Sequence, residues 1–242
     1  MKQPAFATVE EAFVHCRDMD ASLSERLDAF AAASRALRPA MQEAVDRMVD
    51  RLKSHEAGTL APGPGDLMPA FALPDETGRI VTLDALLADG PVAITFHRGH
   101  WCPYCRINTR VLASVHDKIV AEGGSIVAIL PERQTFAAKL KADAGLRYPV
   151  LCDMDNGYAL SINLAIWVGD ELQTLMGDSG RDLPRYQGND SWILPIPATF
   201  VVAPSGRIVA RFIDPDYRKR MAEEDLLEAL RAARVEGRGP SQ

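Results

Sequence analysis

The sequence predicts an α/β protein in which helices flank a mixed central sheet, preceded by a helical segment. Three observations support this fold class. Apolar residues recur at helical spacing through residues 9–56. A linker rich in proline and glycine follows at 61–65. Beyond the linker, short apolar strands alternate with helices. We therefore expect a helical extension over residues 1–58 and one α/β domain over residues 62–235.

The extension contains two signals that set its helices. Ser22 with Glu25 three residues later predicts a capped helix start, and Pro39 breaks the run. A second helix is expected after Pro39, with one apolar face and an end near Gly58. That face consists of Met41, Val45, Met48, Val49 and Leu52. Such a stripe packs against the domain or forms a homodimer.

The elements of the domain follow from apolar runs, helical periodicity and turn residues. The first half contains two short strands within 71–81, a short helix at 82–87, a strand at 92–97, a helix at 102–122, a strand at 125–130, a helix at 134–144 and an extended segment at 149–152. After an irregular insertion with some helix at 156–194, a hairpin of 199–203 and 207–213 and a helix at 223–235 complete the domain. This order is a β-α-β half followed by a β-β-α half, which predicts helices on both faces of a mixed sheet.

Composition limits the partners and the compartment. The chain has 242 residues and a net charge of −6, which argues against nucleic acid or an anionic membrane as a main partner. No apolar run of about 18 residues exists, so no membrane span is expected. The first residues do not resemble an export signal, and we therefore expect a cytoplasmic protein. The four cysteines do not make a disulfide scaffold.

The most informative motif is Trp101-Cys102-Pro103-Tyr104-Cys105, directly after a buried strand. A Cys-x-x-Cys pair at a helix start places both sulfurs on one face of the first turn. The helix dipole and free backbone N–H groups stabilise a thiolate there. We therefore expect Cys102 to have a lowered pKa and to be the attacking thiol, with Cys105 as the resolving thiol.

Four segments carry a resemblance to a known family. They are residues 65–75, 96–105, 197–202 and 214–217. Together they resemble the thioredoxin superfamily, and within it the peroxiredoxin-like branch of the alkyl hydroperoxide reductase and thiol-specific antioxidant (AhpC/TSA) family. The resemblance implies a thioredoxin-like fold and an antioxidant thiol oxidoreductase that reduces hydroperoxides. It implies an external dithiol reductant, such as a thioredoxin, and no nucleotide, flavin or metal cofactor.

The sequence departs from that family at two positions. Peroxiredoxins usually have Thr or Ser where this chain has Gly99, and an Arg where it has Pro197-Ala198. Pro197 resembles the cis-proline of thioredoxins, which predicts a cis Ile196–Pro197 bond lying against the cysteine pair. A thioredoxin-like protein disulfide reductase therefore remains an alternative function. A non-enzymatic redox sensor is a second alternative.

Other residues around the motif are candidates for supporting roles. Arg98 ends the strand beside Cys102 and is a candidate donor to its sulfur or to the peroxide. The position at which thioredoxins bury an Asp is Phe96, so His97 and His100 become the candidates for proton transfer. Trp101, Pro103 and Tyr104 flank the thiols.

Two further interpretations concern a possible metal site and the two isolated cysteines. His97, His100, Cys102 and Cys105 could hold zinc, but their spacing crosses a strand end and a helix start, which disfavours one tetrahedron. We therefore predict no metal. Cys152 could resolve a sulfenic acid, but packing as a small apolar residue is the simpler expectation for Cys152 and for Cys16.

Overall fold

Five strands form the central sheet of the protein, whose structure is a computed structural model that describes residues 6–236. In spatial order they are β5 (Val150–Cys152), β4 (Ser125–Leu130), β3 (Val92–Phe96), β8 (Ala198–Val202) and β9 (Ile208–Ile213). The strands β3, β4 and β5 are parallel, whereas β8 runs antiparallel to both β3 and β9. Every residue of β3 is buried, as its continuous apolar run predicts for a central strand. The predicted mixed sheet is therefore confirmed.

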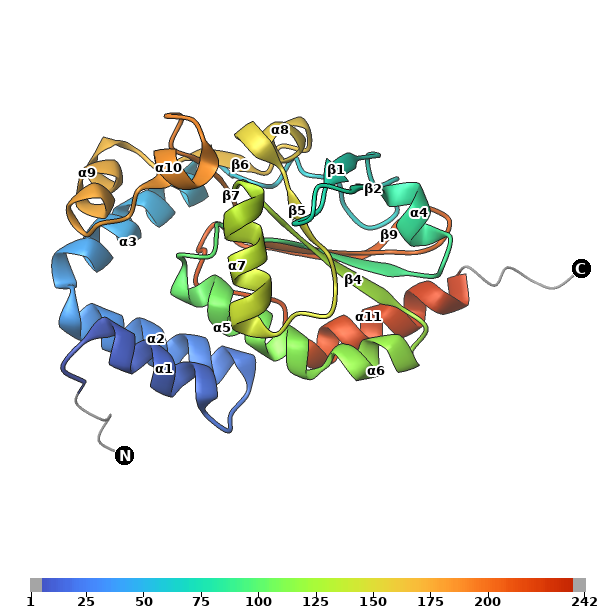
Figure 1. Ribbon diagram of the computed structural model, residues 1–242, viewed down its shortest axis with the longest axis horizontal. Helices are drawn as coiled ribbons and strands as arrows, with labels where there is room; N and C mark the ends of the chain where they lie inside the picture. Colours follow the sequence, from blue (N-terminus) through green and yellow to red (C-terminus); the bar gives the residue numbers. More distant parts are fainter. Residues whose placement is uncertain (1–5, 237–242) are drawn as a thin grey trace, which may run out of the picture.

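Helices cover both faces of this sheet (Figure 1). The first layer consists of α5 (Pro103–Ser114), α6 (His116–Ala121), α7 (Gln134–Ala144) and α11 (Glu223–Glu236). The second layer consists of α4 (Leu83–Leu87), α8 (Gly157–Ser161) and the small hairpin of β1 (Ala72–Pro74) and β2 (Ile80–Thr82). Successive residues of β3 serve the two layers in turn, since Ala93 packs in the first and Ile94 in the second.

The N-terminal extension forms the helices α1 (Val9–Asp18), α2 (Leu23–Leu37) and α3 (Pro39–Ser54). The predicted capping box is present, because Ser22 and Glu25 bond each other's backbone N–H groups. Pro39 occupies the first turn of α3, where its missing N–H costs nothing. The helices α1 and α2 pack against α5, and α3 packs against α9 (Asp170–Asp178). The extension therefore contacts both the helix that follows the cysteine motif and the later insertion.

The insertion has more regular structure than the sequence indicated. Besides α8 and α9 it contains the 3₁₀ turn η1 (Met154–Asn156), which begins just before it, and α10 (Leu183–Gln187). It also contains an antiparallel pair of three-residue strands, β6 (Ala165–Trp167) and β7 (Ile193–Pro195). Strands this short carry too little alternation to be recognised in a sequence. This pairing joins the two ends of the segment that contains α9 and α10, and both helices share a core cluster with α3.

Two other elements complete the comparison with the sequence. The single helix expected over residues 102–122 is divided, because Val115 leaves helical geometry between α5 and α6. The predicted hairpin of β8 and β9 is confirmed, with a register shift between Val201 and Val202.

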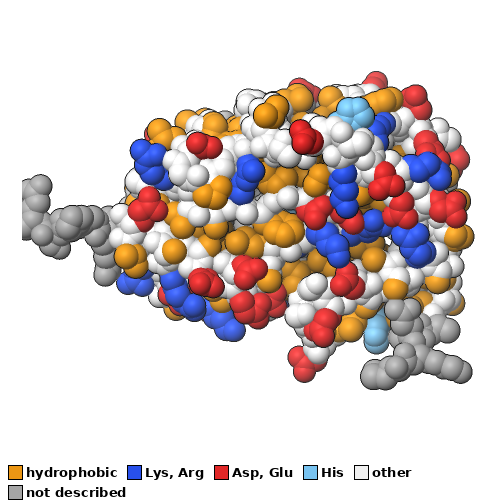
Figure 2. All heavy atoms as spheres, turned by 180° about the vertical axis from the view of Figure 1, so that it is seen from behind, with side chains coloured by type: hydrophobic (Ala, Val, Ile, Leu, Met, Phe, Trp, Pro, Cys, Tyr) orange, Lys and Arg blue, Asp and Glu red, His pale blue; other side chains and the backbone are white. Residues whose placement is uncertain are grey.

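Seen from behind, acidic and basic side chains are interspersed over the surface (Figure 2). Among the described residues, no helix is both long enough and apolar enough to cross a membrane.

Candidate active site

The two cysteines of the motif lie at the start of α5, beyond the carboxyl end of β3. Cys102 is the N-cap residue, Pro103 begins the helix and Cys105 lies in its first turn. Both side chains are buried, with 1% of Cys102 and 0% of Cys105 exposed. They belong to a core cluster that α5 shares with α1 and α2. The helical extension therefore covers the pair directly.

Hydrogen-bond donors and positive charge converge on the sulfur of Cys105. The backbone N–H of Arg98 and the Nη2 of Arg220 each donate to Cys105 Sγ at 3.4 Å. Burial by itself raises the pKa of Cys105, but the hydrogen bond from Cys102, the nearby ring of His97 and the charge of Arg220 outweigh burial. The pKa of Cys105 is therefore well below that of an ordinary thiol.

Cys102 has the opposite shift. Burial, and then the neighbouring sulfur of Cys105, raise the pKa of Cys102 well above its ordinary value, and the charges of Arg98 and Arg220 offset this only in part. The expectation that the helix start would make Cys102 the resting thiolate is thus wrong. Its side chain makes no capping hydrogen bond, and burial is the largest cause of its raised pKa. These opposite directions favour the proton on Cys102 and the negative charge on Cys105.

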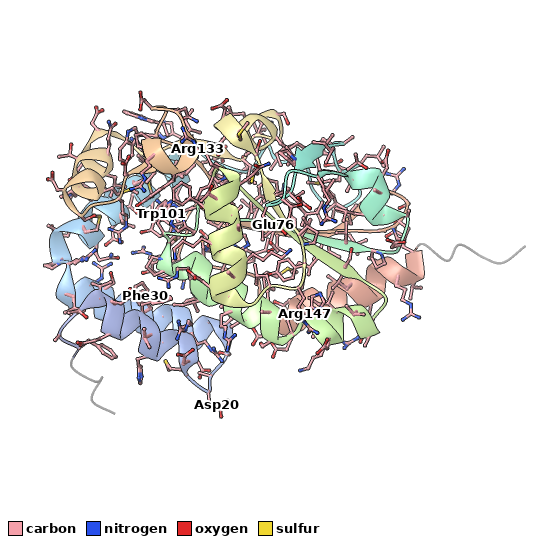
Figure 3. The ribbon with its side chains drawn as sticks, viewed as in Figure 1. Asp20, Phe30, Glu76, Trp101, Arg133 and Arg147 are labelled. Carbon is pink, nitrogen blue, oxygen red and sulfur yellow. The ribbon has the colours of Figure 1, made fainter. Side chains whose placement is uncertain are left out.

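Of the two cysteines, Cys102 is nevertheless the one that lines a cavity. It lines a cavity of about 50 Å³ between the motif, the helical extension and α9, and Cys105 does not line this cavity. Phe30 and Trp101 also line it, and Figure 3 shows Phe30 on α2 and Trp101 in the loop before α5. A small molecule in the cavity would therefore meet the sulfur of Cys102 first.

Arg98 lines the same cavity as Cys102. Only 5% of Arg98 is exposed, and its guanidinium stacks over the ring of Tyr217 at 3.8 Å from the centroid. The ring of Trp101 lies on it at 5.2 Å. Two aromatic faces hold the guanidinium in place without neutralising it. Its charge lowers the pKa of Cys102 and is available to an anion in the cavity.

The two histidines lie in different environments. His97 is fully buried, its Nε2 pairs with Thr95 Oγ1 at 3.0 Å, and its ring lowers the pKa of Cys105. Its Nδ1 has no hydrogen-bond partner among the described residues. His100 instead pairs through Nδ1 with Glu132 Oε1 at 2.8 Å. His97 thus affects the thiol pair, whereas His100 belongs to a separate hydrogen-bonded pair with Glu132.

Glu132 is a buried carboxylate that sequence reasoning missed. It accepts the backbone N–H of His100 at 2.7 Å as well as the imidazole contact. Burial raises the pKa of Glu132, and the hydrogen bonds from His100 counteract that shift. Glu132 follows β4 just as the motif follows β3, and neighbouring parallel strands end at one edge of a sheet. That rule was the sequence signal for its position.

The loop between β3 and α5 requires glycine at residue 99. The φ of +147° at Gly99 favours glycine, and a Cβ there would collide with Trp101 Nε1 and lie 2.7 Å from Glu132 Oε1. Threonine or serine, usual at this position in peroxiredoxins, would collide with both side chains. The departure noted in the sequence is therefore a requirement of this loop.

The prediction for Pro197 is wrong. Among the described residues no peptide bond is cis, and Pro197 does not line the cavity beside Cys102. The chain runs extended from β7 into β8, and the N–H of Ile196 bonds the carbonyl of Leu164. Ala198 then pairs with Phe96 at the end of β3. Both partners are satisfied by continuous extended backbone, which a trans bond provides.

The other candidate residues pack around the pair. Pro103 and Tyr104 line the cavity, and the Tyr104 ring packs edge-on against Phe30 and Tyr217. Cys152 lies in the core beneath α7, where burial raises its pKa to about 12. Cys16 is buried in the cluster of α1, α2 and α5. Within residues 6–236, no group of three or more His, Cys, Asp and Glu side chains is placed to hold a metal ion.

The most consequential residue that the sequence did not reveal is Arg220. Its segment follows β9 and returns over the start of α5, where its Nη1 also bonds the carbonyls of Tyr217 and Lys219. The nearby residues 214–217 attracted notice only through the family resemblance. Nothing in the local sequence indicated that this arginine reaches the sulfur of Cys105.

Comparisons with solved structures agree with this fold. A structure of peroxidoxin BcpB from Mycobacterium tuberculosis has 22% sequence identity and a TM-score of 0.55, and the match covers 70% of this chain and 97% of that one. A mutant of peroxiredoxin 6 from Arenicola marina has 12% identity and a TM-score of 0.56, with 73% and 76% covered. At these identities the likeness shows the fold. No curated protein matches the chain.

The family assignment comes from the sequence model of one family. The model described as the AhpC/TSA family matches residues 64–211, which is more than half of the chain. The match spans the cysteine motif, the strands of the central sheet as far as β9, and the insertion. It confirms the expected peroxiredoxin-like class of thiol peroxidases. The chain therefore belongs to the AhpC/TSA family.

Proposed function

We propose that this protein reduces small hydroperoxides through a dithiol–disulfide cycle of Cys102 and Cys105. The observation that carries the proposal is the cavity of about 50 Å³ that reaches Cys102, while the rest of the pair is enclosed. Such a volume admits a small molecule, which suits a small hydroperoxide better than an extended polypeptide. Only 1% of Cys102 is exposed, so a folded protein could reach this sulfur only if the covering segments moved, whereas a small peroxide in the cavity needs no such movement.

The first step places the reactive charge on the accessible sulfur. The proton of Cys102 moves to Cys105, which already accepts its hydrogen bond. Cys102 Sγ then attacks the distal oxygen of the hydroperoxide, the O–O bond breaks, and Cys102 becomes a sulfenic acid. The departing alkoxide takes the proton from Cys105 and leaves as an alcohol. Cys105 is again a thiolate at the end of this step.

The second step forms the disulfide. Cys105 Sγ attacks the sulfur of the Cys102 sulfenic acid, the S–O bond breaks, and the departing hydroxide takes a proton from solvent to become water. The pair has then given two electrons to the hydroperoxide. An external dithiol, such as a thioredoxin, returns the pair to its reduced form by thiol–disulfide exchange.

The surrounding residues have distinct roles in this scheme. Arg220 and the N–H of Arg98 stabilise the Cys105 thiolate, which makes Cys105 both the proton acceptor and the resolving nucleophile. The Arg98 guanidinium lowers the pKa of Cys102 and is placed to stabilise the alkoxide as it leaves. His97 lowers the pKa of Cys105 through its ring. None of these steps uses a cofactor.

The deciding experiment compares oxidants and cysteine variants. We expect fast consumption of hydrogen peroxide and of an organic hydroperoxide, and slow reduction of insulin disulfides. Cys102→Ser should abolish turnover, and Cys105→Ser should react once and accumulate a sulfenic acid at Cys102, detected by trapping and mass spectrometry. Cys152→Ala is the matched control and should retain turnover, because that thiol is confined to the core. A sulfenic acid formed at Cys105 in the Cys102→Ser protein would reverse the assigned roles.

The same measurements separate the two other functions. Rapid insulin reduction without peroxide consumption would favour a disulfide reductase. The redox-sensor interpretation predicts neither activity but an altered packing of α1 and α2, because these helices share a core cluster with both cysteines. Hydrogen exchange in α1 and α2, compared between the reduced and oxidised protein, would detect that change.

A further inference from the structure

Three arginines from three separate segments line the cavity beside Cys102. Arg38 lies between α2 and α3, Arg98 follows β3, and Arg181 follows α9. Among the described residues that line the cavity there is no Asp or Glu. A concentration of one sign is notable in a chain whose net charge is −6. The cavity is therefore a local site of positive charge in an acidic protein.

The contacts of these arginines leave their charges without a carboxylate. Arg98 stacks on Tyr217 and Trp101, and Arg181 Nη1 donates to Ser179 Oγ at 2.6 Å. The side chain of Arg38 makes no hydrogen bond or ion pair within residues 6–236. Arg218 shows the usual arrangement in this fold, because it pairs with both Asp46 and Asp216. None of the three cavity arginines is thus neutralised by an ion pair with a carboxylate among the described residues.

The electrostatic cost of this arrangement is visible at Arg181. Burial lowers the pKa of Arg181, and the nearby charges of Arg38 and Arg98 lower it further, while Cys102 opposes the shift. The negative charge of the cysteine pair already faces Arg220, which is not one of the three, and it can offset at most one of the three cavity guanidinium charges. Two remain, and a bound anion would relieve their repulsion.

The remaining wall of the cavity is apolar. Met41 and Val45 of α3 face Leu172 and Met176 of α9 across it. Methionine side chains adapt to ligands of different shapes. A ligand matching this surface combines an anionic group, a short apolar segment and a reactive end that reaches Cys102.

We propose that Arg38 and Arg181 form a subsite for the carboxylate of a small organic hydroperoxide whose peroxide group is reduced at Cys102. This substrate class rests on the proposed function. Arg98 lies nearest the thiols and assists the leaving oxygen, so Arg38 and Arg181 provide the carboxylate contacts. Guanidinium groups bind carboxylates through paired, charge-assisted hydrogen bonds.

The test compares a tertiary hydroperoxide that carries a terminal carboxylate with the methyl ester of the same compound. For the wild-type protein we expect kcat/KM for the acid to exceed that for the ester by about tenfold or more, given the usual strength of hydrogen bonds to charged groups. Arg38→Gln and Arg181→Gln should each reduce this ratio about tenfold. The ratio cancels any effect that the two substrates share, including a small change in folding.

Arg185→Gln provides the matched control. Arg185 lies in α10 close to Arg181 in the sequence, is exposed, and does not line the cavity, so the ratio should stay unchanged. Equal kcat/KM for acid and ester in the wild-type protein would overturn the subsite. An unchanged ratio in both the Arg38 and Arg181 variants would also overturn it. So would a loss of activity in these variants that appears only when the thiol reductant, and not the hydroperoxide, carries the carboxylate.

A binding measurement distinguishes failure of the subsite from failure of the proposed function. The hydroxy acid formed by reduction of the same hydroperoxide is titrated into the reduced Cys102→Ser protein by calorimetry, which requires no turnover. We expect about tenfold weaker binding when Arg181→Gln is added. Arginine-dependent binding without consumption of any hydroperoxide would refute the peroxidase and retain the carboxylate site. Peroxide consumption without binding of the hydroxy acid would refute the carboxylate site alone.

Discussion

Arg220 Nη2 donates a hydrogen bond to Cys105 Sγ over 3.4 Å, although the two residues lie 115 positions apart in the sequence. The contact brings a positive charge from the segment after β9 to the first turn of α5. The charge opposes the effect of burial on Cys105 and helps to make this sulfur the anionic member of the pair. The acid–base chemistry of the motif thus depends on a residue outside it.

Replacing Arg220 by Gln should raise the pH at which the cysteine pair forms its first thiolate. The variant loses a charge that lowers the pKa of Cys105, and an opposite charge at contact distance usually shifts a pKa by about one unit or more. The pH dependence of the ultraviolet thiolate absorbance would measure the shift. Arg231→Gln, an exposed arginine paired with Glu122, should leave the titration unchanged. An identical titration in the Arg220 and Arg231 variants would contradict the role assigned to Arg220.

The two single cysteine variants should shift in opposite directions. In Cys105→Ser the remaining thiol of Cys102 loses the neighbouring sulfur that raises its pKa, so its thiolate should form at a lower pH than in the intact pair. In Cys102→Ala, which unlike serine leaves no donor, the remaining Cys105 loses a hydrogen bond that lowers its pKa, so its thiolate should form at a higher pH. Alkylation rates measured across pH would report both shifts, and shifts in the same direction would exclude a shared proton.

Gly99→Ala should destabilise the protein by more than backbone strain alone. A Cβ at residue 99 meets Trp101 Nε1 and Glu132 Oε1, at a φ of +147°. Gly180 also has positive φ, but nothing lies within 4 Å of its Cβ position, so Gly180→Ala measures the strain by itself. We expect a loss of about 1–3 kcal/mol from strain in both variants and an additional loss in Gly99→Ala, measured by urea unfolding. Equal losses would mean that the loop relaxes without cost.

Asp75 should contribute stability that disappears in acid. Its buried carboxylate accepts hydrogen bonds from the Thr77 hydroxyl and backbone N–H and from Arg79, and these overcome burial to lower its pKa from 3.8 to about 2. Because the folded-state pKa is below the unfolded value, the contribution is complete above pH 3.8 and is lost as the pH falls to about 2. Its size is about 2 kcal/mol.

The measurement compares Asp75→Asn with the wild-type protein in urea unfolding at a series of pH values. The difference in unfolding free energy should be largest near neutrality and should shrink between pH 3.8 and about 2. Asp89→Asn removes an exposed carboxylate and serves as the control. If the difference in unfolding free energy stays the same at low pH, the charge of Asp75 is not its cause.

The sequence alone determined the local features of this protein. Ser22 with Glu25 set the start of α2, Pro39 set the start of α3, and the apolar run at residues 92–96 set the central strand. These signals suffice because capping, proline geometry and burial of a continuous apolar strand act over a few residues. The same holds for the position of the cysteines at a strand end and helix start.

Only the tertiary structure decided how the site works. The sequence predicted the charge on Cys102 from the helix dipole, yet the fold brings Arg220 and His97 to Cys105 and buries both sulfurs. The fold also brings Arg38, Arg98 and Arg181 from three separate segments to one cavity. Desolvation and Coulomb interactions depend on distance in space rather than on distance along the chain. The motif therefore identifies the chemistry, and the surrounding fold determines which sulfur carries the charge and what can reach its partner.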